Sequence, residues 1–346
     1  MIHDRRSFLK GITIGAAGLT LGGAPGLPTA QAAVSRSRVS FVAGTDRREM
    51  IRQALKPFEK EISEGVRGKK VVIKPNCVWD SNPLCATHPD AIRGVLDFLR
   101  PFYKGQVVIG ESTASPKGTM YCFEEYGYTP IPKEFDAKLA DLNTDTWTTL
   151  WIQNGRGYPN EIKIIDTFLD PGTYLISLAR MKTHDCVVAT LSFKNILLAA
   201  PLNVMKGHPD FVKNQHEKAK MHEGAGEQGV KGINYNMFLL AQRVRPDFAI
   251  IDGYEGMEGK GPAGGTPVDH RVALAGPDVV SVDRIGLELM GIDYADVGYL
   301  QWCSSAGIGQ GDRAKIDIIG PDPSRYVKKY RLHDNIEWQL KWKDAG

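Results

Sequence analysis

The sequence predicts an α/β fold with a largely parallel, mixed sheet, helices on both faces in three layers, and long loop insertions. β-Branched apolar runs bounded by turn residues alternate with longer segments in which apolar residues recur at helical spacing. This alternation is typical of strand–helix–strand crossovers, which cover both faces of a parallel sheet. A chain of 346 residues is also long enough to bury the core that three layers require.

The first part of the chain alternates clearly between the two patterns. A first strand is expected in "SRVSFVAG", and Thr45 or Asp46 then caps a helix in "REMIRQALKPFEKEI". Pro75 ends the next strand, "GKKVVIKPN", because proline has no N–H for the ladder. Thr87 caps an amphipathic helix in "THPDAIRGVLDFLRPF", and "GQVVIGES" predicts another strand.

The later part of the chain is less regular. Residues 118–154 predict a short helix with irregular structure, and residues 201–231, which are polar and lack periodicity, predict a long loop or lid. Two strands are expected around the turn "DPG", followed by a helix in "CVVATLSFKNILLA". The remaining segments predict a helix, two strands and a helix: "INYNMFLLAQRV", "RPDFAIIDG", "HRVALAG" and "DVVSVDRIGLELMG".

The N-terminus carries an export pattern. Arg5 and Arg6 in "DRRSFLK" precede a short, glycine-rich apolar run, and Ala30-x-Ala32 offers a small-residue cleavage site. This pattern resembles the twin-arginine export signal, which implies the twin-arginine machinery as a partner and a periplasmic or extracellular product. We therefore expect a cleaved signal peptide at residues 1–32, a single α/β domain at residues 33–321, and a basic tail at residues 322–346 that packs on the domain.

Composition and motifs argue against several classes of protein. The formal net charge is only +3 and no basic patch is visible, so nucleic acid is not expected as a partner. No stretch of the mature chain approaches the length of a transmembrane helix. The five cysteines contain no C-x-x-C pair, which disfavours an iron–sulfur cluster. Cys77 and Cys85 flank one loop and could pair in an oxidising compartment, but the sequence does not determine the pairing.

The expected sheet also predicts where a ligand binds. In open α/β sheets, ligands occupy the crevice outside the carboxyl ends of the strands. Four of the expected strands are followed by lysine, carboxylate, amide or imidazole groups, which together can bind an anion, hold a metal or transfer a proton. Any one of them also fits an ordinary exposed side chain, and it is their convergence that indicates a site. They are Lys74 and Asn76, Glu111, Lys182 and His184, and Asp252 and Glu258.

Histidines and a short helix supply further candidates. His184 lies in "KTHDC", and His88 begins an expected helix at the same edge of the sheet. His222 follows His216 by six residues rather than by the four of a zinc-binding H-E-x-x-H helix, so a zinc protease of that type is excluded. Lys194 lies in "SFKN", inside the helix expected after the strand that ends near His184.

The glycine-rich segment "DGYEGMEGKGPAGG" resembles a nucleotide motif only superficially. Gly259, Gly261 and Gly264 spell G-x-G-x-x-G, but seven residues lie between the apolar run "FAII" and Gly259, and a strand rather than a helix follows. A dinucleotide fingerprint needs a strand directly before it and a helix directly after it. We instead expect a loop that folds over the crevice. In this loop Gly261 lets the backbone approach a ligand, while Asp252 and Glu258 point inward as an acidic wall.

Several sequence blocks occur in an order that is found in a known family. The blocks are "VVIKPN", "GES", "MKTH", "TLSFKNI", "KMHEG", "RPDFAIIDGYEGMEGKGPAGG" and "DVVSVDRIG", and they span about residues 70–290. Together they resemble the family called domain of unknown function 362. Some members carry a ferredoxin-like cluster module, from which this chain departs because it lacks closely spaced cysteines. The resemblance marks as site candidates Lys74, Asn76, Glu111, Lys182, His184, Lys194, Asn195, His222, Asp252 and Glu258.

We expect an enzyme whose crevice binds a small anion, such as a carboxylate or phosphate, and transfers a proton. His184 is the expected proton carrier because imidazole changes charge near neutral pH, and Lys74 and Lys182 are expected to hold the anion. The alternative is a non-catalytic ligand- or metal-binding accessory of a periplasmic redox system. The catalytic candidates are His184, Lys74, Lys182 and Lys194; the ligand-binding candidates are Asn76, Glu111, Asn195, Asp252 and Gly261; the candidates for holding a divalent metal are His184, Glu258, His88 and His222.

Overall fold

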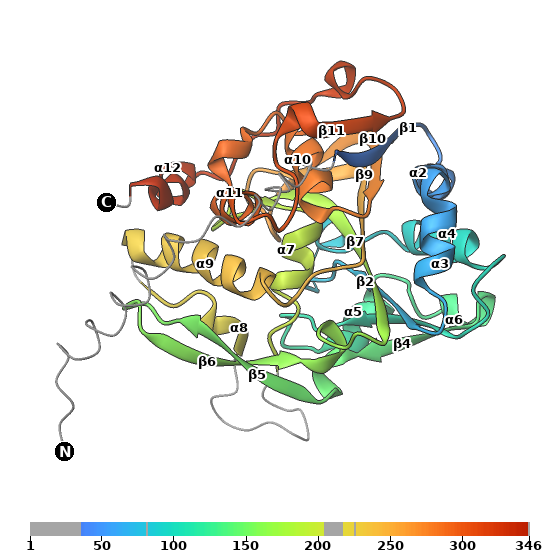
Figure 1. The fold of residues 1–346 in the computed structure, drawn as a ribbon, viewed down its shortest axis with the longest axis horizontal. Coiled ribbons are helices and arrows are strands. Elements are labelled where there is room, and N and C mark those ends of the chain that lie inside the picture. Colours follow the sequence, from blue (N-terminus) through green and yellow to red (C-terminus); the bar gives the residue numbers. More distant parts are fainter. Residues whose placement is uncertain (1–35, 81, 204–216, 225, 345–346) are drawn as a thin grey trace, which may run out of the picture. The chain divides into compact units, whose positions relative to one another are not determined.

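A mixed sheet of nine strands lies at the centre of the described part of the chain (Figure 1). The structure, a computed structural model, describes residues 36–80, 82–203, 217–224 and 226–344. The expected signal peptide and residues 204–216 of the expected lid therefore lie outside the described residues. The strands of the sheet are β1 (Ser37–Ala43), β2 (Lys70–Pro75), β3 (Val107–Glu111), β4 (Ala137–Asp141), β7 (Thr173–Thr183), β8 (Ala189–Thr190), β9 (Phe248–Glu258), β10 (Thr266–Gly276) and β11 (Ile316–Ile319).

The sheet is largely parallel, as predicted. Its strands follow the order β11-β1-β10-β9-β7-β2-β3-β4, and β8 pairs with β7. The neighbours β9, β7, β2, β3 and β4 are parallel, and β1 is parallel to β11. Two strands run against this direction: β10 is antiparallel to β1 and β9, and β8 is antiparallel to β7. The carboxyl ends of β2, β3, β7 and β9 consequently lie at one edge, where the sequence predicts the site.

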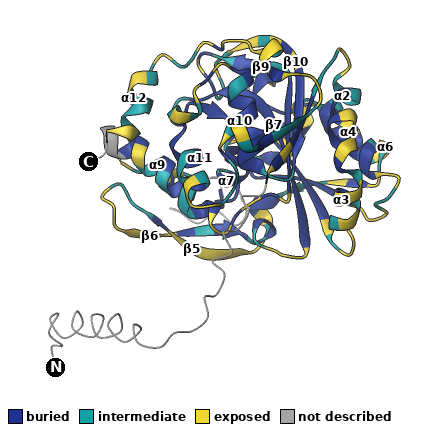
Figure 2. Ribbon diagram, turned by 45° about the horizontal axis from the view of Figure 1, so that its top comes forward, coloured by how far each residue is buried: buried dark blue, intermediate teal, exposed yellow. Residues whose placement is uncertain are grey.

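Alternate residues of the central strands face two apolar cores, which is why the fold has three layers. In β2, Val72 lies in one core, whereas Val71 and Ile73 lie in the other, because successive side chains of a strand point to opposite faces. Figure 2 shows that the strands are largely buried between the helices. One core is covered by α7 (Ser192–Leu197), α9 (Gly226–Ala241) and α10 (Val279–Leu289), the other by α2 (Arg47–Leu55) and α4 (Pro89–Leu99).

The remaining elements lie around these layers. Strands β5 (Trp147–Gln153) and β6 (Pro159–Ile165) form a separate two-stranded antiparallel sheet. β5 lies in the segment that the sequence predicts to be irregular, whereas β6 is the first of the two strands expected around "DPG". No helix of the described residues is long and apolar enough to cross a membrane. The other α-helices are α3 (Glu59–Gly65), α5 (Thr119–Glu125), α6 (Ile131–Glu134), α8 (Glu217–Lys220), α11 (Gly298–Ser305) and α12 (Ile336–Leu340).

The prediction of one helix in "CVVATLSFKNILLA" is wrong. The first half of this segment turns back as β8 against the end of β7, with Val188 at a φ of 67°. Helix α7 begins only at Ser192, where the N–H groups of Ser192 and Phe193 donate to the carboxyl of Asp283 in α10 at 2.8 and 2.9 Å. The first N–H groups of a helix need such acceptors. A residue distant in sequence therefore satisfies the start of this helix.

Strand β9 is longer than the sequence predicts. It pairs with β10 as far as Glu258, and the two strands form a hairpin closed by residues 259–265. The sequence predicts that Asp252 and Glu258 follow the end of the strand, but both lie within it. Their side chains consequently project to the neighbours of β9 rather than into a crevice beyond it.

Candidate functional site

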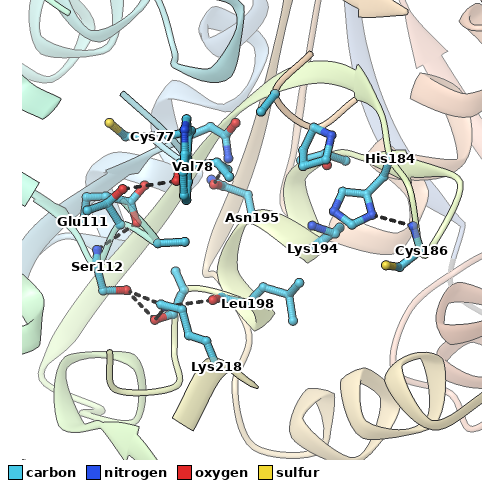
Figure 3. A pocket seen from close by; sticks show the side chains of 18 of the residues that line it. Cys77, Val78, Glu111, Ser112, His184, Cys186, Lys194, Asn195, Leu198 and Lys218 are labelled. Carbon is cyan, nitrogen blue, oxygen red and sulfur yellow. Dashed lines mark hydrogen bonds between the residues drawn. The ribbon is translucent and has the colours of Figure 1, made fainter. Parts of the chain in front are cut away.

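A cavity of about 490 Å³ lies at the carboxyl ends of β2, β3 and β7 (Figure 3). Its position agrees with the crevice rule for α/β sheets, and its volume suits a small-molecule ligand. Three lysines line it, Lys74, Lys194 and Lys218, against two carboxylates, Glu111 and Asp185. Figure 3 shows Glu111 and Lys218 on one side of the cavity, and His184, Cys186 and Lys194 on the other.

Lys74 and Glu111 form a buried ion pair between the ends of β2 and β3. The distance from Nζ of Lys74 to Oε2 of Glu111 is 2.7 Å, and the two side chains are only 2% and 3% exposed. Burial lowers the pKa of Lys74, and the charge of Glu111 opposes this shift. Each charge is costly to bury without the other, so the loss of either residue would leave its partner as an uncompensated buried ion.

Hydrogen bonds around Asn195 connect this pair to the wall of the cavity. An ammonium group can only donate, so Nζ of Lys74 fixes Oδ1 of Asn195 as its acceptor, at 2.7 Å. Nδ2 of Asn195 then donates to the carbonyl of Lys74 and to Oγ of Ser177, and Nδ2 of Asn76 donates to the same Oδ1 at 3.1 Å. The structure thus brings together four residues that the sequence selects: Lys74, Asn76, Glu111 and Asn195.

Lys218 of α8 is a cavity residue that the sequence analysis does not identify. Its Nζ donates to Oγ of Ser112 at 3.1 Å and to the carbonyls of Leu198 and Ala199 at 2.8 and 2.9 Å. Burial lowers the pKa of Lys218 to about 7. Three acceptors match the three N–H groups of an ammonium and favour the charged form, although all of them are neutral. Lys218 lies in a polar segment without periodicity, and its only signal is its position beside "KMHEG".

Lys194 of α7 is buried in the cavity without a hydrogen-bond acceptor among the described residues. Its side chain is on the buried face of a short helix, and the residue is 4% exposed. Burial lowers the pKa of Lys194 to about 8, the nearby Lys74 adds to this shift, and Asp185 and Cys186 oppose it. A lysine whose pKa lies this near to neutrality can gain or lose a proton under ordinary conditions.

His184 is held as a neutral imidazole. The N–H of Cys186 donates to Nδ1 of His184 at 3.0 Å, so in the neutral ring the proton is on Nε2. Burial lowers the pKa of His184 well below its usual value, and the charge of Lys194 lowers it further. His184 can therefore donate a hydrogen bond through Nε2, but its other nitrogen is already occupied. This argues against the predicted role of His184 as the proton carrier.

His184, Asp185 and Cys186 also form a group with metal-ligating atoms. One ligand atom of each residue lies within 4.8 Å of the other two, and Nδ1 of His184 is 3.1 Å from Oδ1 of Asp185. The thiol and the carboxylate could bind a metal ion. Nδ1 of His184, however, already accepts a hydrogen bond, and Lys194 places a positive charge nearby. His222 lines the same cavity with an exposed side chain.

The expected acidic wall is not formed. Asp252 lies 3.3 Å from Nε of Arg47 in an ion pair, and Oε2 of Glu258 accepts the N–H of Arg331. Neither carboxylate lines the cavity. The reason is the extension of β9, which directs these side chains toward other elements.

Two further candidates, His88 and Lys182, lie outside the lining of the cavity. His88 caps α4, where its Nδ1 accepts the N–H of Asp90. Lys182 is buried behind the cavity and donates to the carbonyls of Cys85 and Pro262 at 3.3 and 3.5 Å. Of the predicted metal set, the structure consequently brings only His184 and His222 to the cavity, without His88 and Glu258.

Gly261 serves the hairpin rather than a ligand. A Cβ at this position would lie 2.0 Å from the carbonyl oxygen of Thr183, so only glycine allows the loop to approach the end of β7. The next two residues, Pro262 and Ala263, line the cavity. The loop therefore reaches the crevice, as the sequence predicts, but through these residues. The five cysteines are all free thiols in the structure, so the pairing of Cys77 and Cys85 is not formed.

Comparison with known proteins agrees with the resemblance of the sequence blocks. The family described as "Domain of unknown function (DUF362)" matches residues 71–288, well over half of the chain. The chain is 24% identical over 234 residues to the thylakoid-associated protein sll1697 of Synechocystis sp., which covers 66% of this chain and 65% of that relative. A crystal structure of a protein from Thermotoga maritima matches 62% of this chain and 52% of its own, with 12% identity and a TM-score of 0.34, a likeness too weak to support an argument. The chain belongs to the domain of unknown function 362 family.

Proposed function

We propose that the protein is an enzyme that binds a small organic anion in this cavity and transfers a proton to or from it. The proposal rests on the ammonium group of Lys194, which has no hydrogen-bond acceptor among the described residues. A buried cation without a partner costs free energy, and a bound anion supplies that partner. Lys218, with neutral acceptors, adds a second charge that pairs with no carboxylate among the described residues.

The two carboxylates of the cavity do not cancel the positive charge that is available to this anion. Glu111 is already neutralised by Lys74. The side chain of Asp185 is 45% exposed, so solvent screens its charge. Lys194 is the proposed acid–base group because its pKa of about 8 is close to ordinary working pH. His184 supports it by directing the Nε2–H at an oxygen of the ligand.

Substitution of Lys218 by methionine is expected to weaken the binding of a small anion by about tenfold or more, because a buried positive charge is lost. Isothermal titration calorimetry of the folded protein with lactate, succinate and inorganic phosphate measures this change.

A bound anion favours the protonated forms of Lys194 and Lys218, whose pKa values are lowered to about 8 and 7. Binding at pH 8 is therefore accompanied by proton uptake, and affinity falls as the pH rises from about 7 to 9.

The matched control is Lys56→Met, which removes a lysine whose side chain is 73% exposed on the surface. This variant is expected to bind the same anions as tightly as the wild type. The proposal fails if none of the three anions binds the wild type, or if Lys218→Met binds them with unchanged affinity.

The alternative function is a metal-binding accessory protein, and the group of His184, Asp185 and Cys186 favours it. The same calorimeter distinguishes the two. If the protein is a metal-binding accessory, zinc titrated in place of the anion binds tightly, and Cys186→Ser abolishes that binding. Zinc binding without any anion binding would replace the enzyme proposal by the accessory one.

We also propose that the protein is exported by the twin-arginine route. The motif around Arg5 and Arg6 and the following glycine-rich apolar run support this. Substitution of both arginines by lysine is expected to leave the full-length chain, with its leader uncleaved, inside the cell. Fractionation followed by mass spectrometry of the N-terminus checks the result. Equal export of the wild type and the double variant would contradict the proposal.

A further inference from the structure

Lys194 differs from the other buried lysines at this edge of the sheet. Lys74 donates to Glu111 and Asn195, Lys182 donates to two carbonyls, and Lys218 donates to three oxygen atoms. Acceptors around an amino group favour its ammonium form, in which a proton occupies the lone pair, although burial still lowers the pKa of Lys182 and of Lys218 to about 7. Lys194 has no such acceptor in the described part of the chain. Of these four lysines, it is therefore the one whose amino group lines the cavity with no described protein acceptor to hold it away from a ligand.

The surroundings of Lys194 favour its neutral, nucleophilic form. Figure 3 shows its amino group beside the ring of His184 and facing the open part of the cavity. The ring is neutral and so offers no negative charge to hold a proton on Lys194. Burial lowers the pKa of Lys194 to about 8 against the opposing effect of Asp185 and Cys186, and the charge of Lys74 adds a smaller lowering, so the neutral amine is accessible near pH 8. Desolvation and a cationic neighbour are the two features that activate a lysine amine toward carbonyl groups.

We propose that Lys194 forms an imine with the carbonyl carbon of a 2-oxo acid bound in the cavity. The inference rests on the proposed anion site, because the carboxylate of the 2-oxo acid is the anion and its neighbouring carbonyl is the electrophile. Lys218 supplies a positive charge for the carboxylate. The Nε2–H of His184 is available to the oxygen that becomes negative during the attack.

The reaction balances without an oxidant or reductant. The neutral amine of Lys194 attacks the carbonyl carbon, the π electrons move to the carbonyl oxygen, and protons shift from nitrogen to oxygen to give a carbinolamine. The proton that the ammonium released to solvent before the attack returns to the hydroxyl oxygen, the nitrogen lone pair forms the carbon–nitrogen double bond, and the carbon–oxygen bond breaks so that water leaves. In sum, an ammonium and a ketone become a protonated imine and water, and the single positive charge is retained. Retention of that charge keeps the attraction for the substrate carboxylate.

Borohydride reduction in the presence of pyruvate or 2-oxoglutarate tests this inference. Reduction converts the imine into a stable secondary amine, and peptide mapping by mass spectrometry locates it. We expect a single adduct at Lys194 in the full chain, formed more rapidly at pH 8 than at pH 6 because the attacking amine must be neutral. Lactate, which has a carboxylate but no carbonyl, is expected to give no adduct and to slow trapping by competition.

Variants of Lys194 distinguish imine formation from binding of the carboxylate. Lys194→Arg keeps a positive charge but cannot form the adduct, and Lys194→Met serves as a second variant if arginine disturbs the fold. Calorimetry with lactate reports whether each variant retains the pocket, and Lys56→Met controls for reaction at the surface. Lactate binding without trapping by either 2-oxo acid overturns the imine and leaves the anion site intact. Adducts spread over surface lysines, or undiminished in Lys194→Arg, also overturn it. Failure of lactate, pyruvate and 2-oxoglutarate to bind overturns both.

Discussion

Substitution of Glu111 by glutamine is expected to lower the free energy of unfolding by about 3–5 kcal/mol, the usual cost of breaking a buried ion pair. Glutamine has nearly the same volume but leaves the ammonium of Lys74 without its countercharge, at a position where both side chains are almost fully buried. Oε1 of Glu111 also accepts the N–H of Ser112 at 2.8 Å. Glutamine has only one accepting oxygen, so either Lys74 or this N–H loses its acceptor. Urea denaturation followed by circular dichroism measures the change.

A double-mutant cycle shows whether the charge pair is responsible. Lys74→Met combined with Glu111→Leu removes both charges. The double variant is expected to be less destabilised than the sum of the two single variants, because it leaves no unpaired ion, whereas each single variant leaves one. Glu49→Gln is the matched control, since Glu49 pairs with Arg52 on the surface and should change the stability by less than about 1 kcal/mol. Equal losses in Glu49→Gln and Glu111→Gln would contradict a specific role for burial.

Substitution of Asp283 by alanine is expected to cost about 2–4 kcal/mol and to weaken anion binding as well. The variant leaves the buried N–H groups of Ser192 and Phe193 without an acceptor, and each unsatisfied group costs about 1–3 kcal/mol. These groups start α7, which carries Lys194 and Asn195 into the cavity. Asp283 is thus a positioning residue, and its loss is expected to act on the ligand site through the helix. Denaturation and lactate calorimetry together measure the two effects.

Asparagine at this position distinguishes positioning from a charge effect. Burial raises the pKa of Asp283 to about 8, so asparagine matches the neutral form expected near neutral pH. Its one oxygen can accept only one of the two N–H groups, and its Nδ2 can only donate. Asp283→Asn is therefore predicted to recover part, but not all, of the stability and of the anion affinity that Asp283→Ala loses. Asp312→Ala is the control, because Asp312 accepts the N–H of Ala314 in an exposed turn and should cost about 1 kcal/mol or less. Anion binding by Asp283→Ala as tight as by the wild type would show that α7 does not need this contact.

The layers of the fold could be predicted from local sequence because they depend on local patterns. Apolar runs such as that around Val72 are short and β-branched, and the helical segments that alternate with them have one apolar face. The order of these segments then predicts a parallel sheet with helices on both sides, which the structure confirms. The pairing of β9 with β10 could not be predicted in this way, because two adjacent apolar segments carry no sign of how far their ladder extends.

Part of the cavity followed from the same rule. The ends of β2 and β3 are adjacent because the strands are parallel neighbours, so Lys74 and Glu111 meet there. The prediction for Glu258 is wrong because it assumed that β9 ends early. Lys218 could not be found because α8 is a single turn that reaches the site from a polar segment. The role assigned to His184 changes because its tautomer depends on the N–H of Cys186.

The sequence by itself determined the class of fold, the edge of the sheet that carries the polar residues, and the family. These follow from periodicity, from the direction of parallel strands and from blocks of neighbouring residues. Only the tertiary structure decided which lysines have partners. Hydrogen bonds and burial depend on side chains that are distant in the chain, so four similar lysines acquire different chemistry. Lys74 is paired, Lys182 and Lys218 donate to nearby acceptors, and Lys194 lines the cavity without an acceptor in the part of the chain that the structure describes.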